Sequence, residues 1–178
     1  MELRGLDPDR DQQLFREAYD WIFVAPKWLR QAENIVAGIN GCDSWEGYLK
    51  AAQDPKEVNI GLFGESMEAL FTIQNEGDGC FQVHVNAKPH GRRIHRAHLQ
   101  GWTAPTGEMI AAAIQLRDTL FAQGANEIFG FIAERNRPLR RFADLAGFNF
   151  SGVSIFKGSM RDRPVRWLRY CALREGHA

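Results

Sequence analysis

The chain has 178 residues, of which 44% are hydrophobic and 11% aromatic, enough to bury the core of one domain spanning 1–178. Its 22 basic and 22 acidic side chains cancel to a net charge of zero, which disfavours a role in nucleic-acid binding. Because no apolar run approaches the ~18 residues of a membrane span and the first residues lack an apolar signal core, we expect a cytoplasmic protein without a membrane partner.

The first third of the chain predicts one strand and three helices. Asp7 and Ser44 are expected N-caps, and Pro8 suits a first helical position because its φ angle is already fixed near the helical value. Apolar side chains recur at helical spacing after each cap, which indicates burial against a core. The strand covers 2–6, and the helices cover about 8–24, 28–38 and 44–54.

Three apolar or alternating runs follow and predict strands. Turns rich in Gly, Asn and Asp join them, so we expect an antiparallel meander. In the third strand Phe81, Val83 and Val85 share one face, while Gln82 and His84 share the other. The strands cover 58–63, 69–73 and 81–85.

The second half begins with an irregular link over 96–106 and then predicts alternating elements. A helix ends at Gly124 and leads to a short apolar strand, which we expect to lie parallel to 81–85 because a helical crossover separates the two. A further helix has Pro138 in its first turn and is closed by Gly147. In order, the elements are a helix over 107–122, a strand over 127–133, a helix over 138–145, and an antiparallel pair over 153–156 and 165–173.

The order β-ααα-βββ-α-β-α-ββ predicts an α+β fold with a mixed, mostly antiparallel sheet and helices on both faces. Two features stand out within it: the strand at 81–85 runs into a cationic turn, and Asn136 is followed eleven residues later by Gly147-Phe148. Together they resemble the GNAT superfamily of N-acetyltransferases over essentially the whole chain. The resemblance implies a bound acetyl-CoA whose pantetheine arm pairs with the end of that strand, at Val85 and Asn86.

The family's phosphate-binding loop follows the pattern [Arg/Gln]-x-x-Gly-x-[Gly/Ala]. Small residues are needed there because phosphate approaches the backbone closely. In this chain His90 takes the first position and Gly91 follows it, whereas Arg93 and His95 stand where the small residues belong. Arg92 and Arg93 can bind phosphate through their side chains instead, and Arg93 can equally fill the cradle.

The second motif implies that Asn136 binds the pantetheine arm or caps the helix that follows it. The family often places a tyrosine seven residues after this Asn, as the acid that protonates the departing thiolate. Here Ala143 stands at that position, beside Phe142. Neither side chain can donate a proton.

His84 and Glu134 are the candidates for a general base. Such a base must titrate near neutrality and reach the acceptor amine, directly or through water; either residue can also be an ordinary hydrogen-bonded structural group. Four histidines fall within residues 84–98, but their spacing matches no zinc signature and the intervening turn is cationic, so no metal site is predicted. Three scattered cysteines are expected to be free thiols.

Three functions stay open on these observations. The first is transfer of acetyl from acetyl-CoA to an unidentified amine. The second is a catalytically degenerate protein that acts through protein contacts, since the chain also resembles GNAT-like proteins of bacteriophages and prophages, some of which serve head or virion assembly. Its partner is then a phage or host protein, and its place the host cytoplasm or the virion. The third, nucleic-acid binding through the arginine-rich C-terminal part, is the weakest.

A charge asymmetry bears on these alternatives. Residues 1–89 carry 8 basic and 15 acidic side chains, and residues 90–178 carry 14 and 7, giving net charges of −7 and +7. The imbalance suits an anionic ligand near the second half, or two copies that meet through opposite faces as a homo-oligomer. An ordinary surface distribution explains it as well.

Overall fold

The structure is a computed structural model that describes residues 1–21, 44–88, 107–134, 136–157 and 164–176. Within these ranges, seven strands form one mixed sheet in the order β1-β2-β3-β4-β5-β7-β6, and among their pairings only that of β4 with β5 is parallel. This confirms the predicted fold class. The strands are β1 (Glu2–Leu6), β2 (Glu57–Phe63), β3 (Met67–Gly77), β4 (Cys80–Ala87), β5 (Glu127–Ala133), β6 (Asn149–Lys157) and β7 (Pro164–Leu173).

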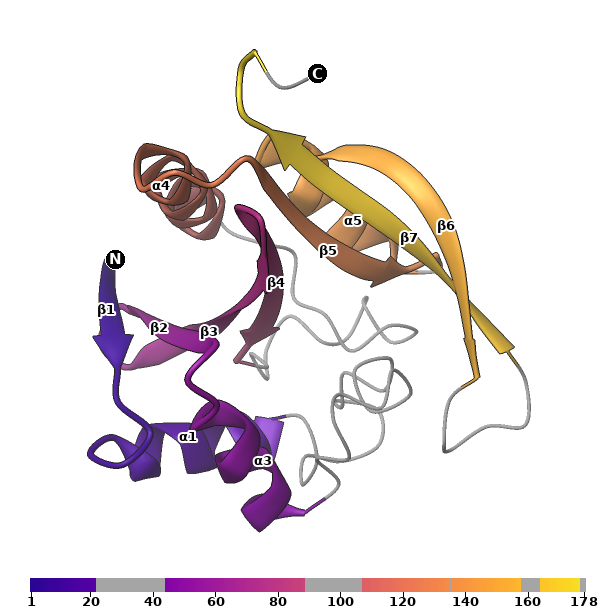
Figure 1. Ribbon diagram of the computed structural model, residues 1–178. Helices are drawn as coiled ribbons and strands as arrows, with labels where there is room; N and C mark the ends of the chain where they lie inside the picture. The colour runs from indigo at the N-terminus through magenta and orange to yellow at the C-terminus, as the bar shows by residue number, and fades with distance from the viewer. Residues whose placement is uncertain (22–43, 89–106, 135, 158–163, 177–178) are drawn as a thin grey trace.

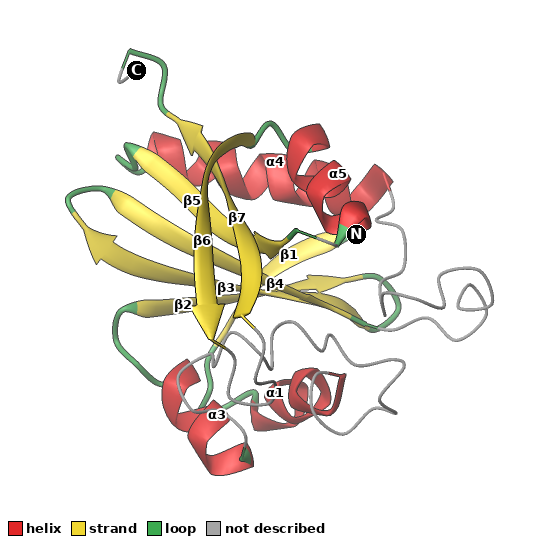
Figure 2. Cartoon of the chain, turned by 90° about the vertical axis from the view of Figure 1, so that its right-hand side faces the viewer, coloured by secondary structure: helices red, strands yellow, loops and turns green. Residues whose placement is uncertain are grey.

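Helices cover both faces of the sheet (Figure 2). On one face, α1 (Gln12–Tyr19) and α3 (Trp45–Ala52) pack over the first three strands. On the other face lie α4 (Gly107–Ala122) and α5 (Arg137–Leu145). Each face buries its own apolar cluster, and each fully buried Leu, Ile or Phe contributes roughly 1.5–3 kcal/mol of transfer free energy. The larger cluster, under α4 and α5, includes Leu62, Phe71, Ile73, Leu116 and Ile128, and the smaller includes Leu6, Phe15, Met67 and Leu70.

The first helix begins later than predicted. Asp7 does not cap it: its carbonyl accepts hydrogen bonds from the backbone of Arg10 and Asp11, and its side chain accepts from the backbone N–H of Asp9. Residues 8–10 therefore form a turn, and α1 starts at Gln12 after Asp11. The error has a physical reason, because Asp-Pro-Asp is as good a turn sequence as a helix start.

The remaining helices agree with the sequence. Ser44 caps α3 by accepting a hydrogen bond of 3.1 Å from the backbone of Gly47. Met109, Ala113, Leu116 and Leu120 of α4 are buried, and Gly124 follows the helix with a φ of +102°. The helix predicted over 28–38 lies outside the described residues. None of the helices within the described ranges is long and apolar enough to cross a membrane.

Candidate functional site

The seam between β4 and β5 is the only parallel pairing in the described sheet, and it is short. The register runs over Cys80–Gln82 against Glu127–Phe129 and stops there. One residue further, a Cβ placed on Gly130 would lie 2.9 Å from the carbonyl oxygen of Val83. The two backbones thus touch at this glycine, and beyond it the strands diverge (Figure 1).

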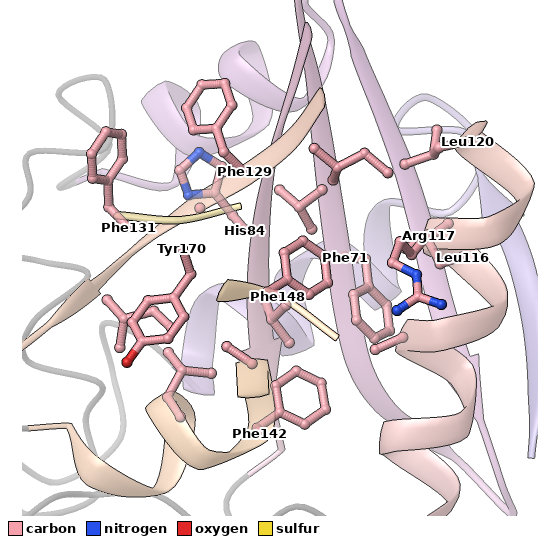
Figure 3. A pocket seen from close by; sticks show the side chains of 18 residues that line it. Phe71, His84, Leu116, Arg117, Leu120, Phe129, Phe131, Phe142, Phe148 and Tyr170 are labelled. Carbon is pink, nitrogen blue, oxygen red and sulfur yellow. The ribbon is translucent and has the colours of Figure 1, made fainter. Parts of the chain in front are cut away.

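A cavity of about 90 Å³ lies where the strands part, beneath α4 and α5. Most of its lining is aliphatic or aromatic, and Figure 3 shows these side chains around it, with His84 and Tyr170 on the side away from Leu116 and Leu120 of α4. Residues from six helices and strands contribute, together with Phe148 between α5 and β6; among them are Val83, Val85, Gly130, Ala143 and Tyr170. A small apolar cavity with few polar groups suits the end of an acyl chain or thioester, whereas whole cofactors need several hundred Å³.

The backbone of Val85 faces the gap between the strands. The carbonyl of Val83 points toward Gly130 of β5, and in an antiparallel pair the backbone groups of residues i and i+2 point the same way. The main-chain N–H and C=O of Val85 are therefore directed away from β3 and into the gap. An extended ligand can pair with such a strand edge, as predicted for the pantetheine arm at Val85.

His84 borders the cavity from the opposite face of β4. The amide nitrogen of Gln82 lies 3.0 Å from its Nε2 atom, so Nε2 accepts and the ring is neutral with its proton on Nδ1. Burial lowers the pKa of His84 to about 4. At neutral pH the ring is therefore uncharged and only a weak base, and its one acceptor nitrogen, Nε2, is already engaged by Gln82.

A row of polar side chains runs across the sheet from His84 to α3. His84 stands opposite Thr72 in the register, and Thr72 stands opposite Asn59. The hydroxyl of Thr72 donates to the side-chain oxygen of Asn59, whose amide nitrogen donates to the carbonyl of Ala52 at the end of α3; both bonds measure 3.1 Å. This row occupies the face of the sheet that α1 and α3 cover.

Three further predicted site residues lie within the described ranges. Asn86 is buried near the end of β4, two residues beyond His84. Glu134, the second candidate base, is 45% exposed, pairs with Arg166 at 3.2 Å and does not line the cavity. Asn136 is buried and caps α5, because its side-chain oxygen accepts from the backbone of Leu139 at 3.2 Å.

The predicted phosphate loop lies outside the described residues. His90, Gly91, Arg92 and Arg93 all belong to it, as does Arg96. The side-chain or backbone binding of phosphate by this loop therefore stays a prediction. Three of the four histidines in 84–98 also lie outside the described residues, so what was predicted of them as metal ligands stays a prediction.

Tyr170 is the residue of the site that the sequence analysis missed. It is buried on β7, and its hydroxyl accepts a hydrogen bond of 3.2 Å from Nε of Arg140 in α5. Arg140 is also fixed through Nη1, which donates to the carbonyl of Glu134 at 3.1 Å. The hydrogen bond to Tyr170 is the main cause that raises the pKa of Arg140 above its usual value. The alternation of Leu168, Tyr170 and Ala172 could have placed this tyrosine on the inner face.

Comparisons with known proteins identify the fold. No protein-family model matches the sequence, and no curated protein matches it. Among solved structures, a spermidine N-acetyltransferase mutant from Vibrio cholerae aligns over 97% of this chain and 95% of its own, with a TM-score of 0.67 and 12% identity. The same enzyme in complex with CoA and spermine gives a TM-score of 0.64 and 14% identity over 99% and 96% of the two chains.

A putative acetyltransferase from Acinetobacter baylyi gives a similar result. Its TM-score is 0.63 at 12% identity, with 98% of this chain and 93% of that chain covered. Identities this low establish architecture and leave activity open. The seven-stranded sheet, with its diverging β4 and β5, has the fold of the GNAT superfamily.

Proposed function

We propose that this protein transfers an acetyl group from acetyl-CoA to an amine. The observation that carries the proposal is the opening between β4 and β5, where a strand edge and an apolar cavity of about 90 Å³ meet. An acetyl thioester fits such a place, and its chemistry is that of an activated acyl group. The structural neighbour solved with CoA and spermine supports the proposal by its fold.

Residues on both faces of the sheet would take part in the proposed reaction. The backbone N–H of Val85 is directed into the gap and would orient or polarise a carbonyl placed there. His84, neutral and on the opposite face, would accept a hydrogen bond or a proton from the amine at Nε2 once Gln82 releases that atom. Asn136 would act by capping α5, while His90, Gly91, Arg92 and Arg93 are proposed to bind the pyrophosphate.

Calorimetric titration with acetyl-CoA tests this proposal. We expect a dissociation constant near 1 μM, about −8 kcal/mol. Absence of heat at millimolar ligand would overturn it. If acetyl-CoA binds, polyamines are the first acceptors to screen, because the solved neighbours include spermidine acetyltransferases.

A second candidate function is assembly with another copy of this chain. β6 is an edge strand, and one of its faces exposes three large apolar side chains: Phe150 at 57%, Val153 at 47% and Ile155 at 67%. The opposite edge differs, since β1 has only five residues and carries Glu2 and Arg4. Short, charged edges resist strand pairing, whereas long neutral ones favour it.

The sequence of β6 is self-complementary. Pairing two β6 strands antiparallel about a two-fold axis at Ser154 would set Val153 of each copy against Ile155 of the other, on one continuous face. One solved neighbour is itself a dodecamer. The finer expectation, that this chain is a bacteriophage or prophage assembly protein, stays a prediction from the sequence.

Light scattering during gel filtration tests this assembly. We expect a dimer or larger oligomer that Ile155→Lys converts to a monomer. Val58→Lys is the matched control, because Val58 is 55% exposed on β2, away from β6. A wild-type monomer at 100 μM, roughly a hundredfold above the concentration at which a micromolar complex forms, would refute the assembly.

A further inference from the structure

The cavity between β4 and β5 extends from the sheet into the core of the protein. Its lining begins at Val85 and Gly130, where the seam opens, and reaches Leu120 of α4 and Ile128 of β5, both of which are buried. Figure 3 shows the lining residues of α4 on the side away from His84. The space therefore leads from the strand edge, where a thioester carbonyl would lie, to the buried face of α4.

The lining of this cavity is apolar, and its few polar side chains have partners elsewhere. Among the lining residues, all of which the structure describes, three have polar side chains. Each forms a hydrogen bond to a residue that does not line the cavity; the pairs are Arg117 with Ala146, His84 with Gln82, and Tyr170 with Arg140. A water molecule needs about two to four polar partners, and apolar cavities stay dry or take up apolar groups. The cavity therefore suits an apolar occupant.

The cavity is larger than an acetyl group needs. One water molecule takes about 10–15 Å³ of such space, so the cavity of about 90 Å³ has room for on the order of six groups of that size. A methylene group is about as large as a water molecule, and acetyl has a single methyl group beyond its carbonyl. Because protein interiors are close-packed and an empty cavity lowers stability, the remaining space indicates an occupant longer than acetyl.

Two alanines leave this space open. Ala113 of α4 and Ala143 of α5 are buried and line the cavity. Their neighbours in the lining are large: Phe142 precedes Ala143, and Leu116 follows Ala113 by three residues and so lies on the same side of α4. A leucine at position 113 would extend into the cavity from that side.

We propose that this cavity binds the acyl chain of the donor, and that CoA thioesters with unbranched acyl groups of about four to six carbons bind more tightly than acetyl-CoA. This inference rests on the proposed function, because it keeps the transfer to an amine and extends only the donor. The amine nitrogen bonds to the acyl carbon, and the carbon–sulfur bond breaks with its electron pair left on sulfur. The amine releases one proton to water and the sulfur takes one up from water, so thioester and amine become amide and free thiol.

Calorimetric titration with acetyl-, butyryl-, hexanoyl- and decanoyl-CoA, in the absence of an amine, tests this inference. Each methylene that leaves water should tighten binding by about 4-fold, so butyryl-CoA should bind about 10-fold more tightly than acetyl-CoA. Decanoyl-CoA should gain nothing over hexanoyl-CoA, because its chain exceeds the cavity. An affinity that keeps rising by the same step up to decanoyl-CoA would indicate an open apolar surface and overturn the inference.

Two substitutions change the size of the cavity in opposite directions. Ala113→Leu should bring the ratio of butyryl-CoA to acetyl-CoA affinity close to 1, and Leu116→Ala should move the best chain length above six carbons. Ala111→Leu is the matched control, because Ala111 is exposed on the same helix, and it should keep the wild-type ratio. If Ala113→Leu does not fold, the wild-type series and Leu116→Ala decide.

The outcomes separate this inference from the proposed function. Equal affinities of the wild type for acetyl-CoA and butyryl-CoA overturn the inference while the proposed function stands. A ratio that the folded Ala113→Leu variant leaves unchanged also overturns it, because the chain then lies elsewhere. If none of the thioesters binds the wild type, the proposed function itself fails.

Discussion

The sheet consists of two wings, β1–β4 and β5-β7-β6. Long ladders pair the strands within each wing, whereas a short ladder pairs the two wings with each other. Within the β1–β4 wing, and within the β5-β7-β6 wing, antiparallel ladders run along the strands; β3 and β4, for example, pair from Ala69–Ala87 to Gly77–Cys80. Between the wings, the ladder of β4 and β5 has three register pairs. The backbone thus holds each wing firmly and joins the two wings only at one end.

Side chains make up for the missing ladder. Phe142 of α5 and Ala146, the residue just after it, pack in the same cluster as Phe71 of β3 and Leu116 of α4, so both helices bridge the wings. A seam held by packing can stay open on the side where a ligand enters, which a continuous ladder cannot do. Under the proposed function, the incomplete seam between the wings is the place where this fold admits its ligand.

Gly130→Val should break the seam and have the largest effect. The new side chain would start 2.9 Å from the carbonyl of Val83, a backbone atom that cannot move aside without shifting β4. We expect a loss of roughly 2–3 kcal/mol in the free energy of unfolding, as for other overpacked sites, together with lost acetyl-CoA binding. Urea denaturation and calorimetry would measure the two effects.

Gly152→Val is the control for this substitution. Gly152 also lies in a strand, but a Cβ there meets no atom within 4 Å. It should change stability by less than about 0.5 kcal/mol. Equal losses in the two variants would mean that the contact between Gly130 and Val83 has no special part in joining the wings.

The sequence was sufficient to predict most of the described elements but not the seam. Alternation assigned Phe81, Val83 and Val85 to one face of β4 correctly, because a strand's period of two fixes its faces. Nothing in that pattern says how far β4 follows β5, since pairing length depends on where Gly130 meets a backbone forty-seven residues away in sequence. Such long-range contacts leave no local signal.

The same limit explains the misjudged strand and the missed tyrosine. β6 begins at Asn149 rather than 153, because a bulge between Phe150 and Gly152 interrupts the alternation that a strand prediction needs. Tyr170 reads as an ordinary strand residue until Arg140 of α5 is placed against it. Asn136, in contrast, could be identified from sequence, since a cap acts on residues three positions away.

Acid should destabilise the protein because His84 is buried at the seam. The pKa of His84 falls from 6.5 to about 4 on folding because burial disfavours its charged form. Between pH 6.5 and about 4, His84 is protonated in the unfolded chain but neutral in the folded chain. As the pH falls through this window, the free energy of unfolding therefore decreases, by at most about 3 kcal/mol. Above pH 6.5 His84 is neutral in both states and contributes no pH dependence.

His84→Gln should therefore flatten the decline in urea midpoint between pH 6.5 and 4. Glu57→Gln is a control of opposite sign within the first wing. Burial, and then the charge of Asp54, raise the pKa of Glu57 to about 7, so this carboxyl lowers stability as pH rises from 4.5 to 7 and its removal should flatten that range. A His84→Gln profile that follows the wild type would contradict the burial of the imidazole.

Gly147→Ala should weaken the helix that bridges the wings. Gly147 has a φ of +80°, and its Cα leaves room for Nη1 of Arg117, which donates to the carbonyl of Ala146 at 2.6 Å. An alanine would add backbone strain and displace this capping arginine. We expect a loss of about 2 kcal/mol, measured by thermal unfolding.

Gly124→Ala separates the two causes. Gly124 also has a positive φ, +102°, but a Cβ there meets no atom within 4 Å. It should cost only the strain, about 1 kcal/mol. If both variants lose the same stability, Arg117 does not matter for α5.

Asn136→Ala should have the smallest effect and bears on the other end of the same helix. The substitution removes the oxygen that accepts from the backbone of Leu139, which costs about 1 kcal/mol for an N-cap. Asn136→Asp keeps an acceptor at this position and should recover much of that stability, whereas a direct ligand of pantetheine would lose affinity for acetyl-CoA in both variants. Stability and affinity measured together thus decide whether Asn136 serves the bridge between the wings or the ligand: a cap alone leaves the affinity of Asn136→Asp at the wild-type value, and a ligand contact does not.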